Sequence, residues 1–305
     1  MIEVNGLTKR YGDVLAVNDL SFTVRPGTVT GFLGPNGAGK STTLRMILGL
    51  NRPTLGTATV EGRPFLRRRA GLHHVGALLD AGDVHPGHSA AAHLTALART
   101  NGIGRRRVGE VLEEVGLASA ARRRVGGFSL GMRQRLGIAT ALLGDPPVLM
   151  FDEPVNGLDP EGVRWVRDLF RNLAAEGRTV LVSSHLMSEM ENTAEHLVVI
   201  GRGELIAQES VAACAARATR TAAHVSVRTP DAGRLATLLT SEGAQVHCDG
   251  PDALTVSGTT ADRIGELAFE HRFMLRGLAP HRASLEDAFM ELTADRAEYR
   301  AGERR

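Results

Sequence analysis

The chain has no long hydrophobic run. Among its 305 residues the strongest apolar stretches, Val148–Phe151 and Val180–Val182, have only the length of a strand. A membrane-spanning helix needs roughly 18 consecutive apolar residues, so no membrane span of its own is expected. The first residues, Met1-Ile2-Glu3-Val4, also lack the basic and then apolar layout of a signal peptide. We therefore expect a cytoplasmic protein.

Cysteine and lysine are both scarce. The two cysteines, Cys214 and Cys248, fit no metal-site spacing, so reduced thiols are expected. Of 36 basic residues only Lys9 and Lys40 are lysines, which makes each of these positions informative. The formal net charge of +2 is close to neutral. Such a balance argues against nucleic acid as a partner.

Short strands and helices alternate along the first two thirds of the chain, which predicts an α/β fold with a largely parallel sheet. The expected strands are 2–4, 16–24, 28–33, 57–60, 148–151, 179–183 and 197–200. The expected helices are 41–50, 161–175 and 186–195. Residues 88–143 have a helical pattern and are interpreted as an insertion into this sheet.

A second, smaller domain is expected after an alanine-rich joint at 211–223, with boundaries at 1–212 and 213–305. Its order of strand, helix, two strands, helix and strand predicts a ferredoxin-like α+β domain. The expected elements are strands 224–228, 244–248, 253–256 and 273–277, helices 232–242 and 261–271, and a last helix at 284–292.

One glycine-rich segment matches the phosphate-binding pattern G-x-x-x-x-G-K-[ST] in full. The segment is Gly34-Pro35-Asn36-Gly37-Ala38-Gly39-Lys40-Ser41, followed by Thr42. Its glycines allow successive backbone N–H groups to surround phosphates, and the following helix N-terminus favours an anion. Lys40 would add a positive charge, and the Ser41 hydroxyl can bind Mg²⁺. The alternative, an ordinary glycine-rich turn, is disfavoured by the strand before it and the helix after it. We expect ATP and Mg²⁺ as ligands, with Thr42 included among the ATP-binding residues.

An acidic pair follows the apolar run 148–151. Asp152 and Glu153 would lie at the carboxyl edge of the sheet, where α/β proteins bind ligands. Asp152 can hold Mg²⁺ through water, whereas Glu153 would point to the other side and act as general base on the attacking water. Many strands end in acids, so the pair alone is a weak signal. Together with the phosphate-binding loop it predicts nucleotide hydrolysis.

Further motifs resemble those of the ABC ATPases. Phe128-Ser129-Leu130-Gly131-Met132 resembles the signature motif that separates this family from other P-loop proteins. Phe151-Asp152-Glu153-Pro154 resembles its Walker B motif, and Asn156-Gly157-Leu158-Asp159-Pro160 resembles its D-loop, with Asp159 as the acidic residue. The resemblance covers about residues 1–210. It implies a P-loop NTPase cassette with an antiparallel β-rich edge.

Two single residues extend the resemblance. His185 matches the family's switch histidine, which would contact the γ-phosphate, and Tyr11 matches the aromatic residue that stacks on adenine. The alternatives are that Tyr11 is a core residue and that His185 is a buried structural histidine.

The chain also departs from the commoner family pattern. Leu130 and Met132 replace the Gly and Gln of the usual signature, and Asp80 stands where the Q-loop has glutamine. A carboxylate at Asp80 could reach Mg²⁺, or it could cap the following turn. Both departures resemble the bacitracin-resistance and antibiotic-exporter branch, as does the segment 283–293.

The resemblance to ABC proteins implies that two cassettes pair head to tail, and that Ser129 and Gly131 would serve the ATP of the opposite cassette. The resemblance implies a second cassette, expected to form a homodimer, and a separate membrane permease. It also implies a place on the cytoplasmic face of the membrane and export of an antibiotic or other hydrophobic compound. The alternatives are an import ATPase and an ABC ATPase that acts on ribosomes or DNA. The latter is disfavoured because the chain has one set of motifs and no sustained heptad pattern.

Overall fold

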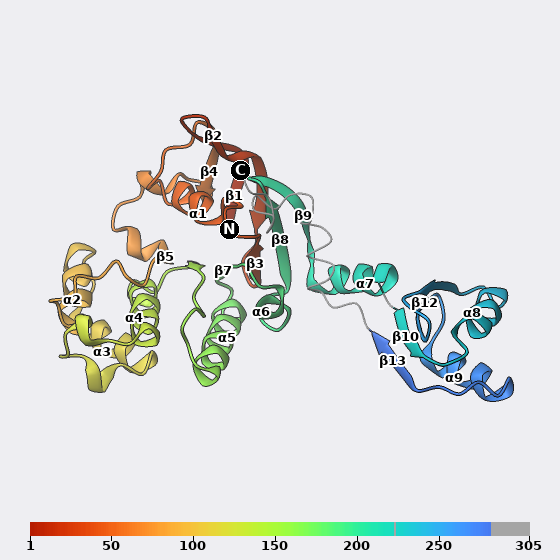
Figure 1. Cartoon of the computed structure of the whole chain (residues 1–305). Helices are drawn as coiled ribbons and strands as arrows, with labels where there is room; N and C mark the ends of the chain where they lie inside the picture. The colour runs from red at the N-terminus through yellow and green to blue at the C-terminus, as the bar shows by residue number, and fades with distance from the viewer. Residues whose placement is uncertain (223, 282–305) are drawn as a thin grey trace. The chain divides into compact units, whose positions relative to one another are not determined.

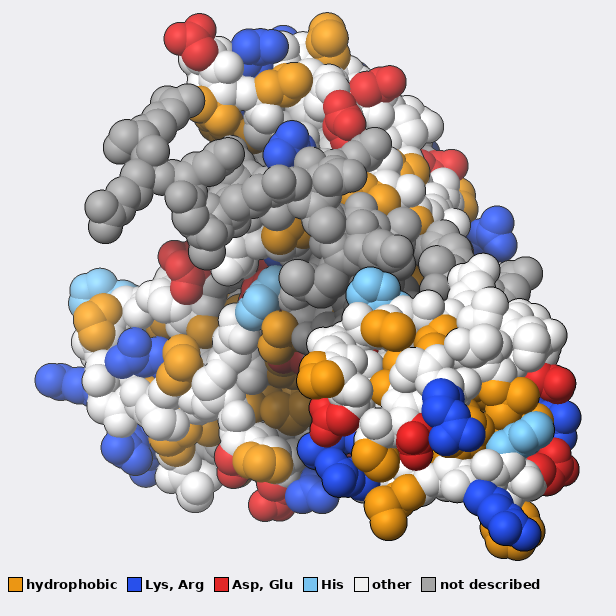
Figure 2. All heavy atoms as spheres, turned by 45° about the vertical axis from the view of Figure 1, so that its right-hand side comes forward, with side chains coloured by type: hydrophobic (Ala, Val, Ile, Leu, Met, Phe, Trp, Pro, Cys, Tyr) orange, Lys and Arg blue, Asp and Glu red, His pale blue; other side chains and the backbone are white. Residues whose placement is uncertain are grey.

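The computed structural model describes residues 1–222 and 224–281, which belong to two compact units (Figure 1). The first comprises Met1–Val211 and the second begins at Ala212. No helix among the described residues is long and apolar enough to cross a membrane. Figure 2 shows a face on which basic, acidic and hydrophobic side chains are interspersed.

A six-stranded sheet forms the centre of the first unit, in the order β5-β6-β7-β3-β8-β9. Five strands are parallel and β9 pairs antiparallel with β8. The strands are β3 (Val29–Leu33), β5 (Val75–Leu78), β6 (Val148–Asp152), β7 (Thr179–Ser184), β8 (His196–Gly201) and β9 (Glu204–Ser210). Every residue of β3, β6 and β7 is buried, as expected for central strands of a parallel sheet. Their carboxyl ends therefore meet at one edge.

Three helices of this unit follow those strands. They are α1 (Lys40–Ile47) after β3, α5 (Pro160–Ala175) after β6 and α6 (Met187–Glu191) after β7. Helix α5 begins where Asp159 accepts a hydrogen bond from the amide of Gly162 at 2.8 Å. A proline at its first position favours this start because its missing N–H would have no intrahelical partner.

An antiparallel sheet in the order β2-β1-β4 lies beside the central sheet's core. Its strands are β1 (Ile2–Tyr11), β2 (Val14–Val24) and β4 (Leu55–Val60). We expected the first strand to end at Val4, which is wrong, because β1 runs on to Tyr11. Irregularities in its pairing with β2 after Val4 interrupt the regular alternation of buried and exposed residues, so the sequence pattern fades before the strand ends.

The expected helical insertion between β5 and β6 is present. It contains α2 (Ala90–Thr100), α3 (Arg105–Glu114) and α4 (Leu130–Leu142). Short 3₁₀ turns occur at Phe65–Arg67, Gly71–His73, Ala118–Ala120 and Val125–Gly127. Helix α4 packs closely on β5, since a β-carbon at Gly76 would lie 1.9 Å from the carbonyl oxygen of Ala141. Only glycine at position 76 allows this approach.

Helix α7 (Val211–Ala222) begins at the last residue of the first unit and continues into the second, in the segment that we interpret as a joint. The further elements of the second unit are β10 (His224–Arg228), α8 (Ala232–Ser241), β11 (Gln245–Cys248), β12 (Ala253–Ser257), α9 (Ala261–Glu270) and β13 (Gly277–His281). The strands form one antiparallel sheet in the order β11-β12-β10-β13. β10 and β11 thus run parallel with β12 between them, which is the ferredoxin-like arrangement.

One expected strand needs correction, and two strands were not expected. The two strands that were not predicted are β5 and β9. The last strand of the second unit is Gly277–His281 and not 273–277. Proline usually interrupts a strand, but Pro280 lies on the edge strand β13, where its missing N–H leaves no partner strand without a hydrogen bond. The helix expected at 284–292 lies outside the described residues.

Candidate nucleotide-binding and hydrolysis site

The glycine-rich loop connects β3 to α1 and has the backbone that its glycines predict. Gly37 and Gly39 have φ angles of 83° and 98°, in the left-handed region that glycine adopts without strain. A β-carbon at Gly34 would lie 2.6 Å from the carbonyl oxygen of Ile200. The loop can therefore keep this path only with glycine at these positions.

A cavity of about 250 Å³ lies over the loop. Its lining residues are Ala16, Pro35, Asn36, Gly37, Ala38, Gly39, Lys40, Ser41, Thr42 and Glu153. The first intrahelical hydrogen bond of α1 runs from the amide of Thr43 to the carbonyl of Gly39 at 2.9 Å, and no side chain caps the helix. The amides of Lys40, Ser41 and Thr42 thus belong to the first turn, which has no intrahelical acceptors. This arrangement fits an anion such as a phosphate.

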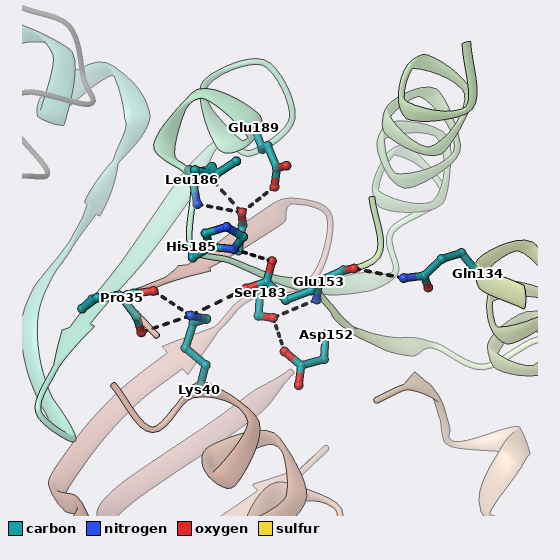
Figure 3. A network of polar contacts seen from close by, with 11 residues as sticks. Pro35, Lys40, Gln134, Asp152, Glu153, Ser183, His185, Leu186 and Glu189 are labelled. Atoms are coloured by element: carbon teal, nitrogen blue, oxygen red, sulfur yellow. Dashed lines mark hydrogen bonds and ion pairs between the residues drawn. The ribbon is translucent and has the colours of Figure 1, made fainter. Parts of the chain in front are cut away.

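Lys40 is the buried cation of the cavity, with 7% of its side chain exposed. Its Nζ donates hydrogen bonds to the carbonyls of Gly34 at 2.6 Å and Pro35 at 3.3 Å, and lies 3.6 Å from Oε1 of Glu153 (Figure 3). Burial lowers the pKa of Lys40, while the nearby carboxylates of Glu153 and Asp152 oppose this shift. A multiply charged phosphate in the cavity would supply the countercharge that a buried ammonium favours.

Glu153 connects Lys40 to His185. Its Oε2 lies 2.9 Å from Nδ1 of His185, and its carboxylate is 21% exposed at the cavity. Its φ angle of 49° lies in the left-handed region, which a residue other than glycine adopts at a cost in free energy. The partly exposed His185 contacts the predicted base directly, so it is not an enclosed structural histidine.

Ser183 is a site residue that the sequence analysis missed. Its hydroxyl donates to a carboxylate oxygen of Asp152 and accepts a hydrogen bond from the backbone N–H of Glu153 at 3.1 Å. Asp152 is buried, and it is not one of the described residues that line the cavity. The sequence does contain a signal for this residue, because two serines end the apolar strand β7 just before His185.

The second of these serines, Ser184, holds the turn after His185. Its hydroxyl accepts a hydrogen bond from the amide of Leu186 at 3.0 Å and donates to the carboxylate of Glu189. Burial raises the pKa of Glu189, although the hydrogen bond from Ser184 opposes the shift.

Gln134 is a further residue that the sequence analysis did not identify. It reaches Glu153 from α4, where its Nε2 donates to the backbone carbonyl of Glu153 at 3.3 Å.

Tyr11 ends β1 and is 46% exposed, so its assignment as a core residue is wrong. Its hydroxyl accepts a hydrogen bond from Asn51 at 2.7 Å, and Lys9 lies over the ring at 4.8 Å from its centre. Tyr11 is not one of the described residues that line the cavity. Adenine stacking on this exposed ring therefore stays a prediction.

For Tyr11→Ala we expect ATP binding to weaken by about 1–3 kcal/mol, the usual contribution of a base stacked on an aromatic ring. The turnover of bound ATP should hardly change, because the ring lies outside the Lys40–Glu153 network. A titration with a fluorescent ATP analogue measures the affinity. Tyr11→Phe is the matched control, since it keeps the ring and loses only the contact with Asn51. An unchanged affinity for Tyr11→Ala would show that the adenine lies elsewhere.

Asp80 follows β5 and is exposed. Its Oδ1 accepts a hydrogen bond from the amide of Gly82 at 2.7 Å, so the carboxylate caps the turn after the strand. Turn capping was one of the two expectations for this residue. A role of Asp80 as a Mg²⁺ ligand stays a prediction.

The signature and the D-loop share a second cavity of about 310 Å³. Ser129, Gly131 and Asp159 all line it, and none of its described lining residues lines the cavity at Lys40. Ser129 begins α4, where its hydroxyl accepts a hydrogen bond from the amide of Met132 at 3.3 Å. Leu130 covers the D-loop, since a β-carbon at Gly157 would lie 2.2 Å from its side chain.

The comparisons with known proteins agree with this geometry. The family model described as ABC transporter matches residues 17–156, and a model described as a domain of unknown function matches residues 223–286. The chain is 42% identical over 209 residues to the bacitracin transport ATP-binding protein BcrA of Bacillus licheniformis, covering 68% of each chain. It is 41% identical over 212 residues to the Nod factor export ATP-binding protein I of Burkholderia orbicola, covering 68% of this chain and 70% of that protein.

A solved structure matches the same part of the chain. The dimeric structure of the bacterial ABC transporter cassette MJ0796 is 25% identical, covers 69% of this chain and 99% of that one, and superposes with a TM-score of 0.64. The α/β cassette fold expected from the sequence is thereby confirmed. The chain belongs to the family of ABC transporter ATP-binding proteins and is an ATPase.

Proposed function

We propose that the chain hydrolyses ATP with Mg²⁺ to drive export of an antibiotic or other hydrophobic compound through a separate membrane permease. One observation supports the hydrolytic part of this proposal: at the loop cavity the carboxylate of Glu153 lies 3.6 Å from Nζ of Lys40 and 2.9 Å from Nδ1 of His185. A buried cation, a carboxylate and an imidazole thus meet where a phosphate fits.

Each of these residues has a distinct proposed role. Lys40 and the amides of the loop bind the phosphates, and the hydroxyl of Ser41 and the carboxylate of Asp152 would hold Mg²⁺. A bound Mg²⁺ ion neutralises charge on the β- and γ-phosphates. Glu153 accepts the proton of the attacking water, and His185 contacts the γ-phosphate while its Nδ1 stays with Glu153.

We further propose that two copies of the chain pair head to tail. The signature cavity with Ser129 and Gly131 is built from α4 and the D-loop and shares no described lining residue with the loop cavity. A phosphate bound at Lys40 therefore needs a second cassette to meet a signature serine. The dimeric structure of a related cassette supports this arrangement.

The proposal of export rests on the relatives named above, one associated with bacitracin transport and the other with Nod factor export. We propose a separate membrane permease as the partner, because both of these relatives are named as ATP-binding proteins of transport or export. We accordingly place the chain on the cytoplasmic face of the membrane.

Purification of the tagged chain from solubilised membranes, followed by ATPase measurements with candidate compounds, tests this proposal. We expect a multi-span protein to co-purify and an exported compound to stimulate hydrolysis. Uptake into cells that depends on the chain would instead favour an importer. An ATPase stimulated by ribosomes or DNA, without a membrane partner, would refute the transport role.

A further inference from the structure

Gln134 is a buried polar residue in the helix that begins at the signature. Only 6% of Gln134 is exposed, and its Nε2 donates to the backbone carbonyl of Glu153 at 3.3 Å. Its Oε1 is buried and has no hydrogen-bond partner among the residues that the structure describes. Figure 3 shows this side chain reaching from α4 to Glu153, on the opposite side from His185. Burying an amide with one end unsatisfied is unfavourable, so packing alone does not explain glutamine here.

The residue that Gln134 contacts has a strained backbone. The φ angle of Glu153 is 49°, and a non-glycine residue in this region persists only where its surroundings hold it. Its carbonyl accepts a hydrogen bond from the backbone N–H of Asn156 at 3.3 Å, within the following turn. Two side chains from other elements also hold the residue: Ser183 of β7 accepts from its N–H at 3.1 Å, and Gln134 of α4 donates to the same carbonyl. The orientation of the Glu153 side chain therefore depends on both the central sheet and α4.

The same helix begins at the second cavity. Ser129 caps α4 and lines the signature cavity, and Gln134 follows five residues later, about 7 Å along the helix axis. Because a helix is stiff over this length, a displacement of its first turn also displaces Gln134. Helix α4 thus connects the cavity proposed for the opposite cassette's ATP to the backbone of this cassette's own Glu153.

We propose that Gln134 is a positioning residue through which α4 sets the orientation of Glu153. Hydrolysis at one P-loop then depends on what occupies the signature cavity of the same cassette. This inference rests on the proposed role of Glu153 as general base.

The test uses the purified full chain and compares Gln134→Leu with Thr140→Val. Thr140 is the matched control because it lies in the same helix and is half-buried. Its replacement by valine removes hydrogen bonds of the hydroxyl, to the carbonyl of Leu136 at 3.0 Å and with Nε2 of His93 at 3.4 Å, without touching Glu153. Misplacing a catalytic group by about 1 Å can cost up to 10²-fold in rate, so we expect kcat of Gln134→Leu to fall by about tenfold or more. Its KM for ATP should stay near the wild-type value, and Thr140→Val should keep both constants.

A second variant, Gln134→Glu, separates positioning from folding. Its carboxylate cannot donate to the Glu153 carbonyl, whereas the protonated acid can. The ratio of its kcat to that of the wild type should therefore rise as the pH is lowered. Because an ionised glutamate at this buried position also destabilises the fold, kcat is divided by the folded fraction that circular dichroism gives at each pH. A side chain with a purely structural role would leave this corrected ratio flat. This variant also serves as the test if Gln134→Leu does not fold.

The outcomes distinguish the positioning role of Gln134 from the role of Glu153 as general base. A kcat for Gln134→Leu that equals the wild-type value, an equal loss in Thr140→Val, or a flat pH ratio for Gln134→Glu would overturn the role of Gln134. Glu153→Gln is measured alongside. If it is inactive while Gln134→Leu is normal, only the positioning role fails. If Glu153→Gln retains wild-type turnover, the general base itself is misassigned.

Discussion

Glu153→Gln should bind ATP normally and turn it over about 10²–10⁴-fold more slowly, the usual contribution of a general base. Such a decrease corresponds to about 3–5 kcal/mol of activation free energy. The neutral amide keeps the size of the side chain and can still lie beside Lys40 and His185, but it cannot accept the proton of water. The substitution removes a negative charge 3.6 Å from Nζ of Lys40 and so reduces repulsion of the phosphates, which means that the affinity for ATP should not fall.

Phosphate release under saturating ATP and Mg²⁺ measures this effect, and a nucleotide titration measures the affinity. Glu113→Gln is a suitable control, because Glu113 is an exposed acid on α3 and undergoes the same chemical change away from the cavity. A rate for Glu153→Gln within about threefold of the wild type would be far below the contribution of a general base and would remove Glu153 from that role.

Ser129→Arg should abolish the ATP-dependent dimer of a Glu153→Gln chain. In the proposed paired arrangement the serine would face the γ-phosphate bound by the opposite Lys40, and an arginine side chain would fill that space. The phosphate already has Lys40 and Mg²⁺ as countercharges, so an added cation does not compensate for the steric block. ATP binding to the single chain should be unaffected, because the loop cavity shares no described lining residue with the signature.

The chain offers a close control for this variant. Ser89 caps α2 as Ser129 caps α4, with its hydroxyl accepting from the amide of Ala92 at 3.2 Å. Ser89→Arg therefore removes an equivalent helix cap, at a usual cost of about 1 kcal/mol, without touching the signature cavity. Size-exclusion chromatography with ATP and Mg²⁺ compares the two double variants. A dimer that survives Ser129→Arg would show that the signature is not at the interface.

Local patterns predicted much of the site. The loop from Gly34 to Ser41 and the acidic pair Asp152–Glu153 each depend on a few consecutive residues and on the strand before them, and the structure brings Lys40 and Glu153 to one cavity. The ferredoxin-like order of the second unit was also readable, since each of its elements is short and bounded by turn residues.

What the sequence did not predict depends on contacts between distant elements. Gln134 lies 19 residues before Glu153, and Ser183 lies 30 residues after it. Neither stands out by residue type, because a glutamine in a helix and a serine ending a strand are ordinary. Only the packing of α4 and β7 around β6 brings them to the two peptide groups that flank the α-carbon of Glu153.

The composite site is tested most directly by the rate of ATP hydrolysis per chain. This rate is measured over a range of protein concentrations in which light scattering detects both single chains and pairs. A site completed by the signature of a second cassette predicts that the rate per chain rises with concentration and levels off as pairs predominate. A rate per chain that stays constant while the protein is monomeric would contradict it, because one cassette alone would then hold everything that hydrolysis requires.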